Sequence, residues 1–240
     1  MRSLLLTPGD DTAKLTVAHA SEAHAVVIDL DLAADRREPA RANAARALIE
    51  ETRHLDAPAL IARLSPLDSG ETDRDLDAIM AAAPFAVMLP RTRRAPEVQQ
   101  LSSKLALREA LNALEDGATA IVASIDTAEG LLAAASLRGS SARLTGLAWD
   151  AEALSAEVGA AASRDRDGAL IAPLQTARDL ILLAAAAARI SAIDAAFAGH
   201  PDAAGLHVEA DTARRSGFVA KLALDPAQAA IINTAFARGK

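Results

Sequence analysis

Residues 25–32 read Ala-Val-Val-Ile-Asp-Leu-Asp-Leu. Four apolar, mostly β-branched residues run without alternation into two acids, Asp29 and Asp31. This pattern is typical of a strand buried on both faces in a parallel sheet covered by helices. In such folds the chemistry lies at the carboxyl ends of the strands, so Asp29 and Asp31 are candidate catalytic residues. Alternatively, either acid caps the next helix or accepts hydrogen bonds from loop amides.

Apolar runs of strand length recur along the chain and alternate with helical patterns. The expected strands are residues 3–7, 25–30, 60–64, 86–89, 120–125, 144–149, 191–197 and 220–224. The expected helices are residues 11–24, 39–52, 71–83, 96–114, 127–137, 151–159, 174–189, 203–216 and 226–238, with Pro39 in a first turn. This alternation predicts an α/β fold, a (β/α)₈ TIM barrel formed as a single domain over residues 1–240. The second choice is an open doubly wound sheet, which is disfavoured because no Gly-x-Gly-x-x-Gly or Walker loop follows the first strand.

Composition excludes several classes of function. A net charge of −7 and 2% aromatic residues argue against nucleic acid as a partner. The absence of cysteine excludes disulfides and thiolate chemistry. The longest apolar tract, residues 180–188, is too short to span a membrane, and Thr7-Pro8 interrupts the opening apolar run too early for a signal peptide. We therefore expect a cytoplasmic protein with no membrane partner.

Five motifs carry a resemblance to a known family. They are Ser-Leu-Leu-Leu-Thr-Pro-Gly-Asp at 3–10, Ala-Val-Val-Ile-Asp-Leu-Asp at 25–31, Arg-Leu-Ser-Pro-Leu-Asp-Ser-Gly at 63–70, Ile-Asp-Thr-Ala-Glu-Gly-Leu at 125–131 and Gly-Phe-Val-Ala-Lys-Leu-Ala-Leu-Asp-Pro-Ala-Gln at 217–228. In order and spacing the chain resembles the citrate lyase β-subunit-like proteins of the HpcH/HpaI aldolase superfamily. The resemblance implies a Mg²⁺-dependent barrel, a homo-oligomer of three or more subunits, that makes or breaks a carbon-carbon bond next to a carbonyl. The substrate would be a small carboxylate or an acyl-CoA thioester.

Cleavage of a hydroxy acid leaves an enolate, which needs a Lewis acid for its oxygen and a cation for its carboxylate. The resemblance implies that Arg63 is this cation, and its planar fork suits bidentate binding. The alternative for Arg63 is a salt bridge to Asp29 or Asp31. The resemblance also implies substrate contacts from Pro66 and Lys221. It implies one from Arg91 too, which stands in Leu89-Pro90-Arg91 where the family has a lysine.

The expected metal site departs from the family pattern. Asp126 stands where the family has a glutamate ligand, and Ala153 stands where it has an aspartate ligand, so one ligand is lost. Asp150 and Glu152 lie close enough in sequence to replace it, since Mg²⁺ accepts one or two carboxylates and completes its shell with water. Alternatively, both acids are solvated or cap the short helix that follows.

Other departures concern the cofactor and the chain end. Asp11 replaces a basic residue near the expected CoA phosphates, which it would repel, and Asp225 stands where histidine is frequent. We expect no C-terminal lid segment of the kind that longer relatives carry. No histidine pair has the spacing of a zinc helix, and the five are His19, His24, His54, His200 and His207.

Two hypotheses follow. The first is a carbon-carbon lyase of altered substrate range, in which Arg63 binds a carboxylate and Asp126 leads a diverged Mg²⁺ site. The second is a catalytically lapsed barrel that binds a small carboxylate or acts as an assembly partner. Ala153 favours the second hypothesis, whereas Arg63 and Asp126 favour the first.

Overall fold

The computed structural model describes residues 1–51, 58–198 and 202–237. Within these ranges parallel strands pair in chain order and β1 also pairs with β8, which closes the barrel. The strands are β1 (Ser3–Pro8), β2 (Ala25–Asp29), β3 (Ala59–Arg63), β4 (Ala86–Leu89), β5 (Ala120–Ile125), β6 (Leu144–Trp149), β7 (Ser191–Asp194) and β8 (Ala220–Ala223). The predicted (β/α)₈ barrel is confirmed, and the doubly wound alternative is wrong.

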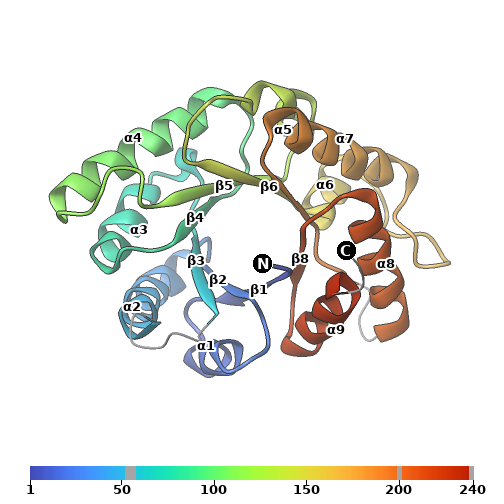
Figure 1. Cartoon of the computed structure of the whole chain (residues 1–240), viewed down its shortest axis with the longest axis horizontal. Helices are drawn as coiled ribbons and strands as arrows, with labels where there is room; N and C mark the ends of the chain where they lie inside the picture. The colour runs from blue at the N-terminus through green and yellow to red at the C-terminus, as the bar shows by residue number, and fades with distance from the viewer. Residues whose placement is uncertain (52–57, 199–201, 238–240) are drawn as a thin grey trace.

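Helices surround the ring of strands (Figure 1). They are α1 (Thr12–His19), α2 (Ala34–Glu51), α3 (Thr72–Ile79), α4 (Ala95–Leu111), α5 (Ala128–Ala133), α6 (Ala151–Glu157), α7 (Ala172–Ala188), α8 (Ala203–Ser216) and α9 (Pro226–Ala237). Short 3₁₀ turns are Leu67–Ser69, Met80–Ala82 and Ala134–Leu137. No helix in the described ranges is long and apolar enough to cross a membrane.

Apolar side chains form two layers because successive residues of a strand point to opposite faces. Val27 and Ile61 belong to the cluster inside the barrel, whereas Val26, Ile28 and residues of the helices form the larger outer cluster. The strands are therefore buried on both faces, as their continuous apolar runs predict. This alternation also decides which polar residues face the mouth of the barrel.

Several predicted boundaries differ from those of the structure, and three of them have a clear consequence or cause. Strand β7 ends at Asp194 instead of residue 197, because side chains bind the carbonyls that follow: Lys221 Nζ donates to Ala195 and Gln228 Nε2 to Phe197. Helix α1 ends at His19. Helix α2 begins one turn early, so Pro39 lies inside it and not in its first turn.

Some expectations lie outside the described residues. These are the placement of His54 and His200 and the predicted helix ends at residues 52 and 238.

Candidate active site

Charged residues gather where strands β2 to β6 end. Val27, Ile61 and Ala148 pack inside the barrel. Because side chains alternate along extended backbone, the residue two positions later, at or just after the end of each strand, points to the same side, above the interior core. These residues are Asp29, Arg63 and Asp150. The sequence pattern thus brings acids and an arginine to one mouth of the barrel.

Arg63 is the centre of this group. Its Nη1 donates to Asp29 Oδ1 at 2.8 Å and lies 3.5 Å from Asp31 Oδ2. The side chain of Asp31 also approaches Arg91, with 3.6 Å between Oδ2 and Nη2. The bond between Asp29 and Arg63 joins neighbouring residues, since the two are direct partners in the register of β2 and β3. Both the salt bridge and the proximity of two acids that the sequence suggested for Arg63 are therefore present.

Asp126 lies beside this group at the end of β5 and is 5% exposed. Its Oδ1 accepts a hydrogen bond from Ser124 Oγ at 2.5 Å, and its Oδ2 accepts one from the Arg91 backbone N–H at 2.9 Å. Arg91 adopts φ +50°, a left-handed conformation that is strained for a residue with a side chain. The turn after β4 thus stores strain while its N–H binds Asp126.

The charged groups at the ends of β2, β3 and β5 shift one another's pKa values. Burial alone would lower the pKa of Arg63, but the carboxylates of Asp29, Asp126 and Asp31 raise it above its ordinary value. Burial raises the pKa of Asp126, and the negative charge of Asp150 adds to that rise. Burial likewise raises the pKa of Asp29 despite the bond to Arg63. The carboxylates at the mouth are thus incompletely compensated.

Asp150 and Glu152 occupy different surroundings. Asp150 is the N-cap of α6, where its Oδ1 accepts from the backbone N–H groups of Glu152 at 2.9 Å and Ala153 at 3.1 Å. Glu152 is exposed, and its Oε1 accepts from Ser163 Oγ at 2.6 Å. Within residues 1–51, 58–198 and 202–237, no three His, Cys, Asp or Glu side chains converge closely enough to hold a metal ion.

Pro66 and Lys221, two further predicted substrate contacts, lie in different parts of the barrel. Pro66 is buried in the loop after β3, where its carbonyl accepts from Ser69 and Thr72. Lys221 does not lie at the mouth. Ala220 and Leu222 face the interior of the barrel, so Lys221 between them points outward, is 0% exposed and binds Asp194 at 2.9 Å and Glu209 at 2.8 Å. The expected contact of Lys221 with substrate is not supported by this position.

Ser124 and the turn at Arg91 were missed by sequence reasoning. Ser124 interrupts the apolar run of β5 two residues before Asp126. A hydroxyl on the interior face of a buried strand needs a partner, so this interruption was a usable signal. The sequence contains no signal that predicts the positive φ of Arg91.

Fold and site define a (β/α)₈ barrel with an arginine-carboxylate cluster at the carboxyl ends of its strands. The chain belongs to the HpcH/HpaI aldolase/citrate lyase family, which it matches over residues 2–226.

Proteins of several named activities resemble it along most of its length. A citrate lyase subunit beta-like protein of Mycobacterium tuberculosis is 30% identical over 97% of this chain and 77% of that protein. A (3S)-malyl-CoA thioesterase of Cereibacter sphaeroides is 30% identical over 98% of this chain and 76% of that protein. The crystal structure of CitE from M. tuberculosis with magnesium, acetoacetate and coenzyme A has a TM-score of 0.78 at 29% identity, covering 99% of this chain and 81% of that one.

Proposed function

We propose that this barrel binds a small carboxylic acid at its mouth and makes or breaks the carbon-carbon bond next to a carbonyl, through an enolate. The observation that carries the proposal is that the hydrogen-bond donors of Arg63 are only partly engaged. Within the described residues its guanidinium donates one hydrogen bond, from Nη1 to Asp29. The other N–H donors of its planar fork suit the two oxygens of a substrate carboxylate.

The carboxylates supply proton chemistry and charge. Asp29 has a raised pKa and is 17% exposed at its side chain, so it can hold and release a proton at the mouth. Asp31 lies between Arg63 and Arg91 and fixes both cations. Arg63 and Arg91 also favour the negative charge that develops as the bond breaks.

Relatives with this fold hold magnesium. The residues of this chain suit a magnesium site with fewer carboxylate ligands. Asp126 is buried with an incompletely compensated charge, and Asp150 is near enough to raise its pKa. Two carboxylates are sufficient for Mg²⁺, which usually keeps several water ligands. When bound, the ion polarises the carbonyl oxygen and stabilises the enolate. Ala153 contributes no ligand, and Glu152 is engaged with Ser163.

The relatives support the class of substrate. The CitE structure contains magnesium, acetoacetate and coenzyme A, and the thioesterase is named for an acyl-CoA of a hydroxy acid. We extend to this chain the shared chemistry of these molecules, a short acid with a second carbonyl or hydroxyl group. We also propose that the barrel assembles with further copies of itself.

Ala153 favours a second candidate function, a barrel that binds a small carboxylate without turnover. In that case Arg63 still binds the acid, but Asp126 and Asp150 hold no ion strongly enough for catalysis. The two candidates share the carboxylate site and differ in the metal.

Calorimetric titration of Mg²⁺, with and without pyruvate or oxaloacetate, separates them. We expect Mg²⁺ to bind more tightly when the keto acid is present, and Asp150→Asn to abolish this gain while it retains the helix cap, since asparagine also caps helices. Glu152→Gln is the matched control and should behave as the native chain. If neither Mg²⁺ nor the keto acid produces heat, the lyase proposal fails. Heat from the keto acid alone, lost in Arg63→Met, would favour the second candidate.

A further inference from the structure

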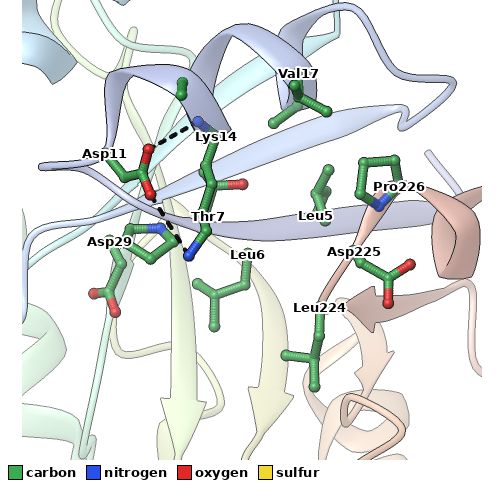
Figure 2. Close-up of a pocket in the computed structure, with 13 residues that line it drawn as sticks. Leu5, Leu6, Thr7, Asp11, Lys14, Val17, Asp29, Leu224, Asp225 and Pro226 are labelled. Atoms are coloured by element: carbon green, nitrogen blue, oxygen red, sulfur yellow. Dashed lines mark hydrogen bonds and ion pairs between the residues drawn. The ribbon is translucent and has the colours of Figure 1, made fainter. Parts of the chain in front are cut away.

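Helix α1 has a cavity on each side. One opens beside β1 and the turn from β8 to α9, and Lys14 and Val17 of α1 line it (Figure 2). The other has a volume of about 580 Å³ and lies between α1 and α2, which are neighbours on the outside of the barrel (Figure 1). We call this second cavity the α1–α2 groove. None of the described residues that line it belongs to the charged cluster at the mouth.

The groove lies on the outer side of the sheet. Val26 and Ile28 line it and belong to the outer apolar cluster, whereas Val27 between them belongs to the cluster inside the barrel. Strand β2 therefore separates the groove from the mouth. Leu15 of α1 and Ala47 of α2 add hydrocarbon walls. An apolar group that enters the groove exchanges water for these walls, which is favourable.

Two side chains of opposite charge line the groove from α2, one turn apart. They are Arg46 and Glu50. For an ion pair between residues four apart on a helix, the acid before the base is the better order, and here the order is reversed. In the part of the chain that the structure describes, neither side chain forms an ion pair. Both charges are therefore available to a ligand.

Hydrogen bonds orient Arg46 in the groove. Nδ2 of Asn43 donates to the Gly9 carbonyl at 3.0 Å. Because this bond fixes the amide, Oδ1 of Asn43 is left to accept from Arg46 Nη2. Among the described contacts this is the one hydrogen bond of Arg46, so other N–H donors of its guanidinium can bind a carboxylate. His19 lines the groove from α1 and can donate to the same carboxylate.

We propose that the α1–α2 groove is a second binding site, for a free α-amino acid with an apolar side chain. The carboxylate of the ligand binds Arg46, its ammonium group binds Glu50, and its side chain lies between Leu15 and Ala47. Hydrogen bonds in which both partners are charged are the strong ones. Glu50 repels a simple acid and Arg46 repels a simple amine, so the two charges also select the ligand. The site does not depend on the function proposed above.

Ligands that lack one charge test the proposal. Leucine, 4-methylpentanoate and 3-methylbutylamine share an isobutyl group, and each is titrated into the full chain at millimolar concentrations while amide NMR signals are followed. We expect leucine to shift the signals of Leu15, His19 and Ala47 saturably. The other two should bind about tenfold more weakly, since each loses a charged hydrogen bond. Absence of saturable shifts with leucine, or equal affinity for 4-methylpentanoate, overturns the proposal.

Exchange of the two charges is a sharper test. The double variant Arg46→Glu, Glu50→Arg keeps the net charge and places the acid before the base, the order that favours an ion pair. The two side chains should then bind each other, and leucine affinity should fall about tenfold or more. Urea unfolding should show that the fold is retained. Arg46→Lys keeps the positive charge and should retain most of the affinity, whereas Arg46→Gln should not. Native affinity in the exchanged variant overturns the proposal.

A further control separates the groove from the mouth, where the proposed function places another carboxylate. The leucine shifts at Leu15 should persist in Arg63→Met and disappear in Ala47→Leu, whose larger side chain fills the groove. Ala42→Leu is the matched control, because Ala42 is exposed on α2 and does not line the groove. Loss of the shifts in Arg63→Met would place the amino acid at the mouth and overturn the inference. The proposed function is tested by pyruvate and Mg²⁺ binding, which none of these titrations uses.

Discussion

Two charged clusters in this barrel contain the same residue types but differ in how completely their carboxylates are compensated. At the mouth, Arg63 makes one hydrogen bond to Asp29, and the pKa values of Asp29 and Asp126 are raised by burial. Behind β7 and β8, Lys221 binds Asp194, Glu209 and the Ala195 carbonyl.

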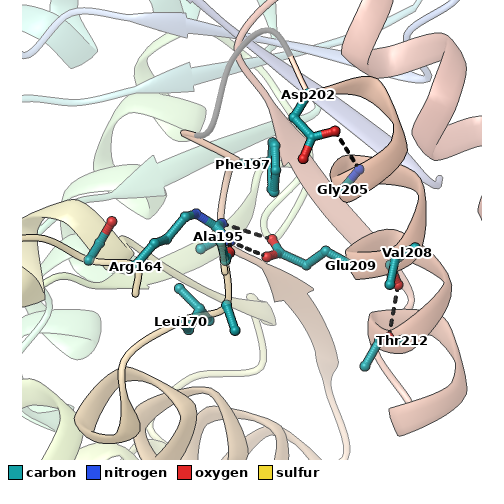
Figure 3. A network of polar contacts seen from close by, with 12 residues as sticks. Arg164, Leu170, Ala195, Phe197, Asp202, Gly205, Val208, Glu209 and Thr212 are labelled. Atoms are coloured by element: carbon teal, nitrogen blue, oxygen red, sulfur yellow. Dashed lines mark hydrogen bonds and ion pairs between the residues drawn. The ribbon is translucent and has the colours of Figure 1, made fainter. Parts of the chain in front are cut away.

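The second cluster is nearly closed to solvent and densely bonded. Arg178 makes two hydrogen bonds to Asp194. Arg164 makes two to Glu209 (Figure 3), and its guanidinium lies 4.3 Å from the centre of the Phe197 ring. Burial would raise the pKa of Asp194 and of Glu209, but the cations around them lower it in both cases.

The direction of the pKa shift thus distinguishes the clusters. Where the carboxylates are fully compensated, the charges fix the strand ends and the loop after β7. Where compensation is incomplete, donors and negative charge remain for the ligand that we propose. The comparison predicts that substitutions behind β7 and β8 affect folding and that substitutions at the mouth affect binding.

The largest expected effect is that of Lys221→Met. It leaves Asp194 and Glu209 buried with one cation fewer, so we expect the free energy of unfolding in urea to fall by about 3–5 kcal/mol. Arg63→Met is the control, and it should cost less than Lys221→Met, because Asp29 has a raised pKa and 17% exposure and can take up a proton when its cation is removed. Equal losses in the two variants would contradict the distinction between the clusters.

At the mouth, Arg63→Lys should weaken pyruvate binding about tenfold to a hundredfold, because an ammonium group replaces a planar fork that bonds both carboxylate oxygens. Calorimetry measures the affinity, and urea unfolding shows whether the fold is retained. Unchanged affinity would mean that Arg63 serves only as the partner of Asp29.

Sequence alone was sufficient for the barrel and for the group at its mouth. Apolar runs marked the strands, and residues 86–89, 120–125 and 144–149 begin and end where the structure has them. The carboxyl ends of parallel strands share one edge, so Asp29, Arg63 and Asp126 were predictable neighbours.

Lys221 and Ser124 were harder for physical reasons. The run Ala220-Lys221-Leu222 does not say which face of β8 points inward. That face follows from barrel closure and from Asp194 and Glu209, which belong to other elements. Ser124 interrupts the apolar run of β5 and so indicates a buried hydroxyl that needs a partner, but only the structure shows that this partner is Asp126.

The two clusters should also respond oppositely to pH. A raised pKa means that Asp126 favours the folded state at low pH and opposes it as pH rises through its folded pKa. Asp194, whose pKa is lowered, favours the folded state above its unfolded pKa, and this contribution is lost as pH falls through the folded value.

Asparagine variants test this in the presence of a chelator. At neutral pH, Asp126→Asn should raise the free energy of unfolding and Asp194→Asn should lower it, with an effect smaller than that of Lys221→Met. Asparagine at 126 keeps both bonds, since its oxygen accepts from the Arg91 N–H and its amide donates to the Ser124 hydroxyl. Urea unfolding between pH 4 and 8 measures both, and the gain at Asp126 should disappear toward pH 4. A loss of stability in both variants would remove the contrast.

The smallest expected effect is at Ala153. The magnesium site that we propose has one carboxylate fewer than the family pattern, and Ala153 follows the N-cap Asp150 by three positions in the first turn of α6, where an acid is favourable. Ala153→Asp should therefore tighten Mg²⁺ binding about threefold to tenfold, because affinity rises with the number of charged ligands, and should leave the fold intact. Adding Asp126→Glu should raise the affinity further. Calorimetry measures both, with Ala156→Asp as the control on the exposed side of the same helix. If Ala153→Asp and Ala156→Asp bind Mg²⁺ equally, the start of α6 does not border the metal site, and Asp150 is only a helix cap.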